Sequence, residues 1–191
     1  MCPGESEGLP AAEAALLRAA QAGDPAALDQ LLAPHERPLL ALCRGILGHT
    51  EDAQDAAQET LFRALRALPR FRPGQATFRT WLFRIGVNVC LNWKRERRPS
   101  EPWDEEHPGP GFEAASPETI ALQRLQITEA LGTLPPHHRA VLLLKVVEGW
   151  SVAEIAGAMG WNNKRVENEL YRARRALAEW QARNADEGEE P

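Results

Sequence analysis

Apolar residues recur along most of this chain at spacings of three and four residues, which is the period of an α-helix. Strand-like alternation is absent, and β-branched residues are sparse. One segment interrupts the pattern, because residues 99–116 are rich in proline, glycine and acidic residues and have no apolar period. The sequence therefore predicts an all-α fold of two small helical domains joined by a flexible acidic linker.

This interruption sets the predicted domain bounds. We expect a first domain over residues 1–98, the linker over 99–116, a second domain over 117–184 and an acidic tail over 185–191. Each domain is near the lower size range for an independent core. No apolar run approaches the length of a membrane span, and the N-terminus has neither the basic nor the apolar region of a secretory signal.

The three cysteines are far apart, and no CxxC or Cys/His cluster accompanies them. Neither a disulfide framework nor a metal site is indicated, no cofactor motif is found, and a reducing cytoplasm fits best. Cys43 and Cys90 are expected to be small core residues. His137-His138 follows two prolines at a helix start and is interpreted as a capping or surface feature, so an enzyme is not indicated.

Charge is segregated along the chain. The net charge of −5 argues against nucleic acid, yet residues 61–98 carry ten bases and one acid, while residues 1–60 carry ten acids and three bases. A polyanion meets the local field and not the average, so the middle block favours an anionic partner.

In the first half, Asp24-Pro25 is typical of a helix N-cap followed by proline at the first helical position. Pro34 and Pro38 are expected to break or kink that helix. A second helix opens at Thr50 or Glu51, and its apolar face is predicted to contain Ala53, Ala57, Leu61, Ala64, Leu65 and Leu68.

The second half predicts a helix-turn-helix. Ser151 and Glu154 form an S-x-x-E capping box, Gly160 lies where a tight turn needs positive φ, and Asn162 or Asn163 can cap the next helix. A helical hairpin that binds nothing has the same pattern. In the last helix an apolar stripe lies opposite a basic one, and we expect Val166, Leu170, Ala173 and Leu177 to be buried.

Two acids accompany this basic helix. Glu169 is placed on its flank, where it can pair with Arg165 and Arg172 at helical spacing. Glu167 has two open roles, orienting a basic side chain or accepting a hydrogen bond from a cytosine amino group.

The stretch from Thr77 to Arg98 interleaves aromatic residues with bases and amides, a combination that suits unpaired bases. Trp81 and Ile85 are expected in the core, whereas Trp93 is harder to bury and favours function.

These motifs resemble the sigma-70 family of bacterial transcription factors, specifically its extracytoplasmic-function (ECF, group IV) members. "DAQDAAQETLFRALRALPRF" resembles region 2.2, "RPGQATFRTWLFRIGVNVCLNWKRERR" resembles regions 2.3 and 2.4, and "LPPHHRAVLLLKVVEGWSVAEIAGAMGWNNKRVENELYRARRAL" resembles region 4. The resemblance implies a sigma factor that binds core RNA polymerase, at the β′ clamp helices and β flap, and directs it to promoter DNA. It also implies an anti-sigma factor as a partner.

The resemblance carries three sets of site residues. The polymerase-binding set is Asp55, Gln58 and Glu59. The set for the single-stranded −10 element is Arg70, Phe71, Thr77, Arg79, Asn88, Asn92, Trp93 and Lys94. The set for the duplex −35 element is Asn163, Lys164, Arg165, Asn168, Arg172 and Arg175.

Two other classes of protein remain open. A free-standing helix-turn-helix regulator would bind duplex DNA without polymerase, but it leaves the acidic helix and the aromatic-basic block without a role. An interaction protein that binds polymerase without initiating transcription is disfavoured by the intact −10 and −35 residue sets.

Overall fold

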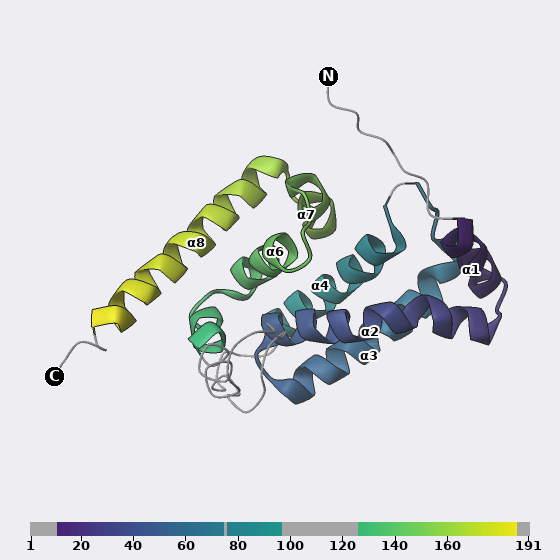
Figure 1. Cartoon of the computed structure of the whole chain (residues 1–191), viewed down its shortest axis with the longest axis horizontal. Coiled ribbons are helices and arrows are strands. Elements are labelled where there is room, and N and C mark those ends of the chain that lie inside the picture. The colour runs from purple at the N-terminus through teal and green to yellow at the C-terminus, as the bar shows by residue number, and fades with distance from the viewer. Residues whose placement is uncertain (1–10, 75, 97–125, 187–191) are drawn as a thin grey trace, which may run out of the picture.

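The computed structural model describes residues 11–74, 76–96 and 126–186 of the chain, and in these ranges it contains helices and no strands. The elements are α1 (Ala11–Gln21), α2 (Pro25–Leu47), α3 (Thr50–Ala67), the 3₁₀ helix η1 (Leu68–Arg70), α4 (Phe78–Glu96), α6 (Pro136–Val146), α7 (Val152–Met159) and α8 (Asn163–Asp186). A further helical segment spans residues 126–132. The all-α prediction is confirmed, while the predicted linker lies outside the described residues (Figure 1). None of the described helices is long and apolar enough to cross a membrane.

Helix α2 begins and ends where local sequence signals place it. The Asp24 side chain accepts hydrogen bonds from the backbone N–H groups of Ala26 and Ala27, at 2.9 and 3.3 Å, and Pro25 occupies the first helical position. Gly48 ends the helix in the left-handed conformation, with φ of 86°. The predicted N-cap is therefore confirmed.

Pro34 and Pro38 were expected to break or kink α2; the break is wrong, and the kink stays a prediction. The helix continues through Pro34 and Pro38 to Leu47. Pro34 is exposed and Pro38 is half-buried, so the carbonyl groups that lose a helical donor can turn to water. Leu31 and Leu39, which precede and follow the two prolines in sequence, are buried, so packing stabilises the helix on both sides of them.

Helices α2, α3 and α4 form the core of the first half. Phe78, Leu82 and Phe83 of α4 are fully buried within it. Helix α4 comes close to its neighbours at Gly86, where a Cβ atom would lie 2.8 Å from Leu39 Cδ1. The glycine allows these helices to approach each other.

In the second half, α7 and α8 have the predicted helix-turn-helix caps. Ser151 and Glu154 form the reciprocal capping box of α7. Gly160 ends that helix with φ of 67°, and Asn162 Oδ1 accepts a hydrogen bond from the backbone N–H of Arg165 at 2.8 Å. Val166 is fully buried.

The two halves pack against each other, as Figure 1 shows, with α6 against α2 and α7 against α4. A single cluster of buried apolar side chains continues from Phe83 of α4 to Trp150, whose ring centroids are 6.4 Å apart. Leu143 of α6 lies over Gly45 of α2, where a Cβ atom would be 2.5 Å from Leu143 Cδ1. The domain pattern of the sequence contains no sign of this contact.

Candidate nucleic-acid and protein interfaces

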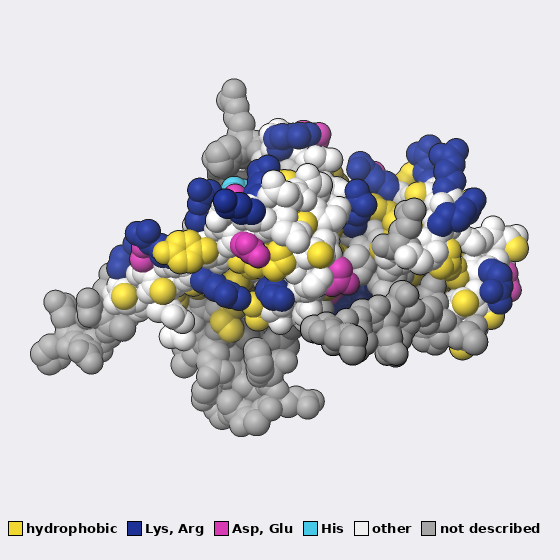
Figure 2. Space-filling view, turned by 90° about the horizontal axis from the view of Figure 1, so that it is seen from above, with side chains coloured by type: hydrophobic (Ala, Val, Ile, Leu, Met, Phe, Trp, Pro, Cys, Tyr) yellow, Lys and Arg dark blue, Asp and Glu magenta, His cyan; other side chains and the backbone are white. Residues whose placement is uncertain are grey.

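Helix α8 presents a basic surface on the side away from its buried stripe. Val166, Leu170 and Ala173 are buried, whereas Leu177 is partly buried. The predicted −35 residues are all exposed, namely Asn163, Lys164, Arg165, Asn168, Arg172 and Arg175. Figure 2 shows Lys and Arg side chains (dark blue) gathered over the part of the surface that α8 forms. This arrangement can attract a phosphate backbone and offer hydrogen-bond donors to base edges.

Two basic residues of this surface are oriented by neighbours on the same helix or its N-terminal turn. The guanidinium of Arg165 lies over the Trp161 ring, 4.1 Å from its centroid, in a cation–π contact. Arg175 pairs with Glu179, and that pairing raises the pKa of the arginine. Tyr171 is 67% exposed and adds an aromatic ring to the edge of the surface.

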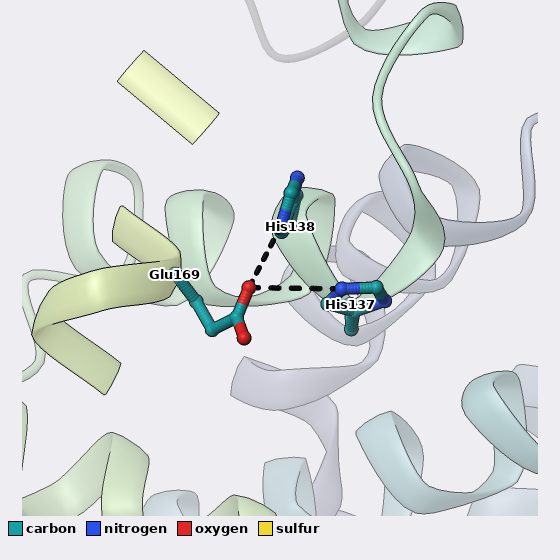
Figure 3. Close-up of side chains that lie close together, drawn as sticks. All are labelled: His137, His138 and Glu169. Atoms are coloured by element: carbon teal, nitrogen blue, oxygen red, sulfur yellow. Dashed lines mark hydrogen bonds and ion pairs between the residues drawn. The ribbon is translucent and has the colours of Figure 1, made fainter. Parts of the chain in front are cut away.

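Glu169, predicted to lie on a flank of α8 between the apolar and basic stripes, is only 6% exposed. Its Oε2 accepts a hydrogen bond from His138 at 2.7 Å and lies 3.7 Å from His137 Nε2, while its Oε1 lies 3.6 Å from Arg172 (Figure 3). Of its two predicted partners, Arg172 is confirmed, whereas Arg165 turns to Trp161.

The histidine pair matches its prediction as a capping or surface feature only in part, because the His137 side chain is 43% exposed but His138 is not on the surface. The N-cap of α6 is Pro135, which has no side chain that can cap, and the His138 side chain is only 13% exposed. Both rings turn towards α8 and contact Glu169 (Figure 3). Burial and the positive charges nearby lower the pKa of His137. Glu167, in contrast, is exposed, and its two roles stay open.

The predicted −10 residues differ in how far the structure exposes them. Arg70, Thr77, Arg79 and Asn88 are exposed, and Asn92, Trp93 and Lys94 are half-buried. The Thr77 hydroxyl accepts a hydrogen bond from the backbone N–H of Thr80 at 3.1 Å, at the start of α4. Trp81 and Ile85 pack against the core, as expected, and so does part of Trp93.

Phe71 is 6% exposed, and its ring packs against Phe78 and Trp81, with centroids 5.9 and 4.9 Å away. In this conformation the ring supports the loop before α4 and is not offered to a base. The resemblance alone placed Phe71 among the −10 residues, and its contact with DNA stays a prediction.

Arg79 is engaged by the other half of the molecule. Its Nη2 donates a hydrogen bond to Glu148 Oε2, and its guanidinium lies 5.4 Å from the centroid of the Phe83 ring. Burial raises the pKa of Glu148, and the charge and hydrogen bond of Arg79 oppose that shift. A residue predicted to contact the −10 element therefore has a protein partner in this structure.

On α3, the predicted polymerase-binding residues share a surface with apolar side chains. Asp55 and Gln58 are exposed, and Glu59 pairs with Arg63 at 2.6 Å. Phe62, which the sequence interpretation did not select, is 54% exposed. Leu65 was placed on the buried face but is 38% exposed. An acidic surface with exposed apolar side chains can bind a basic, partly apolar protein surface.

Comparison with known proteins assigns each half of the chain to a known protein family. Residues 31–99 match the Sigma-70 region 2 family, and residues 124–177 match the family Sigma-70, region 4. The sigma factor SigM of Mycobacterium tuberculosis is 36% identical over 168 residues, covering 87% of this chain and 83% of SigM. The RNA polymerase sigma-H factor of Pseudomonas aeruginosa is 32% identical, covering 85% of this chain and 90% of that protein.

The solved structure of CnrH in complex with the cytosolic domain of CnrY matches with a TM-score of 0.67 and 29% identity. It covers 90% of this chain and 97% of CnrH. The sigma factor SigG of M. tuberculosis is 38% identical, but the chain spans about half of its length, 46%.

The fold and both family matches define a protein of the sigma-70 class, with region 2 before region 4. Within that class, the chain belongs to the family of ECF RNA polymerase sigma factors.

Proposed function

We propose that this protein is an alternative sigma factor, which acts in the cytoplasm. It binds core RNA polymerase and directs the polymerase to a promoter. The observation that carries the proposal is the presence, on one chain, of a basic helix-turn-helix surface on α8 and an acidic, partly apolar surface on α3. A sigma factor needs both, one for duplex DNA and one for polymerase. The role is non-enzymatic.

The −35 surface would be the set of six exposed residues on α8. Lys and Arg side chains there would contact phosphates, which position the helix, and Asn168 and Arg172 would reach base edges, which specify sequence. The net charge of −5 weakens unguided DNA binding, which suits a factor that acts within a holoenzyme.

The polymerase surface would comprise Asp55, Gln58 and Glu59, extended by the exposed rings and methyl groups of Phe62 and Leu65. Apolar side chains at the centre of an interface supply most of its binding free energy, whereas the charged rim mainly orients the partner. Truncating Phe62 should therefore weaken polymerase binding more than truncating Glu59.

The −10 strand would be captured by the loop over residues 70–77 and the exposed side of α4. Because Arg79 is bound to Glu148, its part in this role requires region 4 to move away from region 2. Phe71 packs against Phe78 and Trp81 of region 2 itself, so its part requires the loop before α4 to rearrange. An anti-sigma factor would hold the factor inactive. CnrH, which is similar to this chain, was solved bound to the cytosolic domain of CnrY.

The test is transcription in vitro with core RNA polymerase on a library of −35/−10 templates. Wild-type protein should yield defined transcripts, and Asp55→Ala combined with Phe62→Ala should abolish them, while Gln54→Ala, which replaces an exposed residue on the same helix, should not. Transcripts that persist in the double variant would contradict the proposal that this surface of α3 binds polymerase. No transcripts, with polymerase-independent duplex binding, would indicate a free-standing regulator instead.

The −35 surface is tested separately on holoenzyme. Lys164→Ala and Arg175→Ala should each weaken promoter binding and lower the slope of log affinity against log salt by about 1. Arg183→Ala makes the same charge change near the end of α8 and serves as the matched control. Equal effects of all three substitutions would mean that α8 contributes only general charge.

A further inference from the structure

A cluster of two imidazoles and one carboxylate lies between the start of α6 and the middle of α8 (Figure 3). His137, His138 and Glu169 each present one ligand atom, and these three atoms lie within 4.8 Å of one another. The cluster is sheltered, because the His138 and Glu169 side chains are 13% and 8% exposed, while His137 is 43% exposed and faces solvent. None of these groups is among the site residues predicted from the sequence.

The spacing of the three ligand atoms is close to that of a tetrahedral metal site. Bonds of about 2.0–2.2 Å to imidazole nitrogen and carboxylate oxygen place neighbouring ligand atoms about 3.3 Å apart. The Glu169 oxygen is now 2.7 Å from His138 and 3.7 Å from His137, so small rotations of side chains bring both distances to that value.

The two oxygens of the Glu169 carboxylate face different partners. Its Oε2 faces the two histidines, whereas Oε1 faces Arg172 at 3.6 Å. A metal ion on Oε2 would therefore leave the arginine contact in place.

From this geometry we propose that His137, His138 and Glu169 bind one divalent transition-metal ion, with Zn²⁺ as the prime candidate. Imidazole ligands suit Zn²⁺, Co²⁺ and Ni²⁺, whereas Mg²⁺ and Ca²⁺ prefer oxygen ligands throughout. Water would complete the coordination on the exposed side of His137. The ion would join the start of α6 to α8 and so stiffen the helix-turn-helix unit.

Two features weaken the expected affinity for a metal ion. Arg172 lies 3.6 Å from Glu169 Oε1, and its positive charge opposes a cation bound nearby. His138 Nδ1 is buried and has no hydrogen-bond partner among the described residues. Metal-bound histidines are usually reinforced by such a partner, and its loss costs about 10–100-fold in affinity.

The experiment uses the full chain without an affinity tag, in a Cys2→Ser background that removes a thiol outside the described residues. Titration with Co²⁺ should produce visible absorption bands of a tetrahedral site that saturate at one ion per chain. Zn²⁺ should displace Co²⁺ and raise the melting temperature, while Mg²⁺ should do neither. This readout does not depend on transcription, so it can fail or succeed independently of the sigma-factor proposal.

Three variants decide the outcome. His138→Ala and His137→Ala should each weaken binding by about tenfold or more, whereas His49→Ala, which removes a histidine before α3, should leave it unchanged. Circular dichroism checks that each variant is folded, and the half-exposed His137 keeps the test valid if His138→Ala unfolds. Absence of saturable Co²⁺ binding, or binding that survives His137→Ala, would mean that the cluster is an ion-pair network only.

Discussion

Arg79 of α4 and Glu148, which follows α6, form an ion pair that joins region 2 to region 4. The two residues are 69 positions apart in sequence, and the carboxylate is 5% exposed while the guanidinium is 44% exposed. While the two regions are packed together, Arg79 is therefore bound to Glu148. It becomes available to the −10 strand, as predicted, only when the regions separate.

The buried carboxylate of Glu148 makes this contact pH-dependent. Because its pKa is raised in the folded protein, the folded state binds more protons than the unfolded state between the two pKa values. The contribution of Glu148 to the free energy of unfolding is therefore fully present below the unfolded pKa and is lost as pH rises through the folded pKa.

Because the ionised carboxylate of Glu148 is disfavoured in the folded protein, Glu148→Gln should leave the free energy of unfolding at neutral pH unchanged or raise it by up to about 1 kcal/mol. This is expected although the substitution removes an ion pair. Denaturant unfolding of both proteins at neutral and mildly acidic pH measures the difference. The advantage of the glutamine variant should shrink as pH falls. A variant that is less stable at neutral pH would show that the ion pair outweighs the burial of the carboxylate.

Gly45 is the point where α2 approaches Leu143 of α6, so a side chain at this position should push the two regions apart. Gly45→Leu should cost about 1–3 kcal/mol of the packing free energy and increase the radius of gyration measured by small-angle X-ray scattering. Ala33→Leu on the exposed face of the same helix is the control and should change neither. An unchanged radius for Gly45→Leu would mean that Leu143 yields and the closed arrangement persists.

Two helical glycines should respond in opposite directions to alanine. Gly86→Ala places a Cβ 2.8 Å from Leu39 Cδ1 in the core and should destabilise the protein by about 1–3 kcal/mol. Gly157→Ala meets no atom within 4 Å and should stabilise by about 0.5–1 kcal/mol through helix propensity. Denaturant midpoints test both, and the same sign for both substitutions would contradict the packing argument.

Cys43 and Cys90 are both fully buried. A hydrogen bond with Cys43 and burial raise the pKa of the Cys90 thiol well above its ordinary value. Since the thiolate is the reactive form, both groups in a Cys2→Ser protein should react with Ellman's reagent at least about a hundredfold more slowly than in the unfolded chain. Prompt reaction of the native protein would contradict the core role expected from the sequence, whereas slow reaction supports it.

Local sequence signals determined where helices begin and end, and which side of α8 is exposed. The Asp24 cap, the Ser151 and Glu154 capping box and the turn at Gly160 involve partners within four residues, so the sequence displays them directly. The exposure of the −35 residues followed from the helical period.

Only the tertiary structure decided the contacts between distant segments. Burial of Phe71, the continuous helix through Pro34, and the contact of Glu169 with His138, 31 positions away, depend on which elements pack together. Periodicity shows that a residue can face a partner but not which partner. The packing of α2 and α4 against α6 and α7 was likewise hidden, because apolar side chains suited to a domain core serve equally well between two regions.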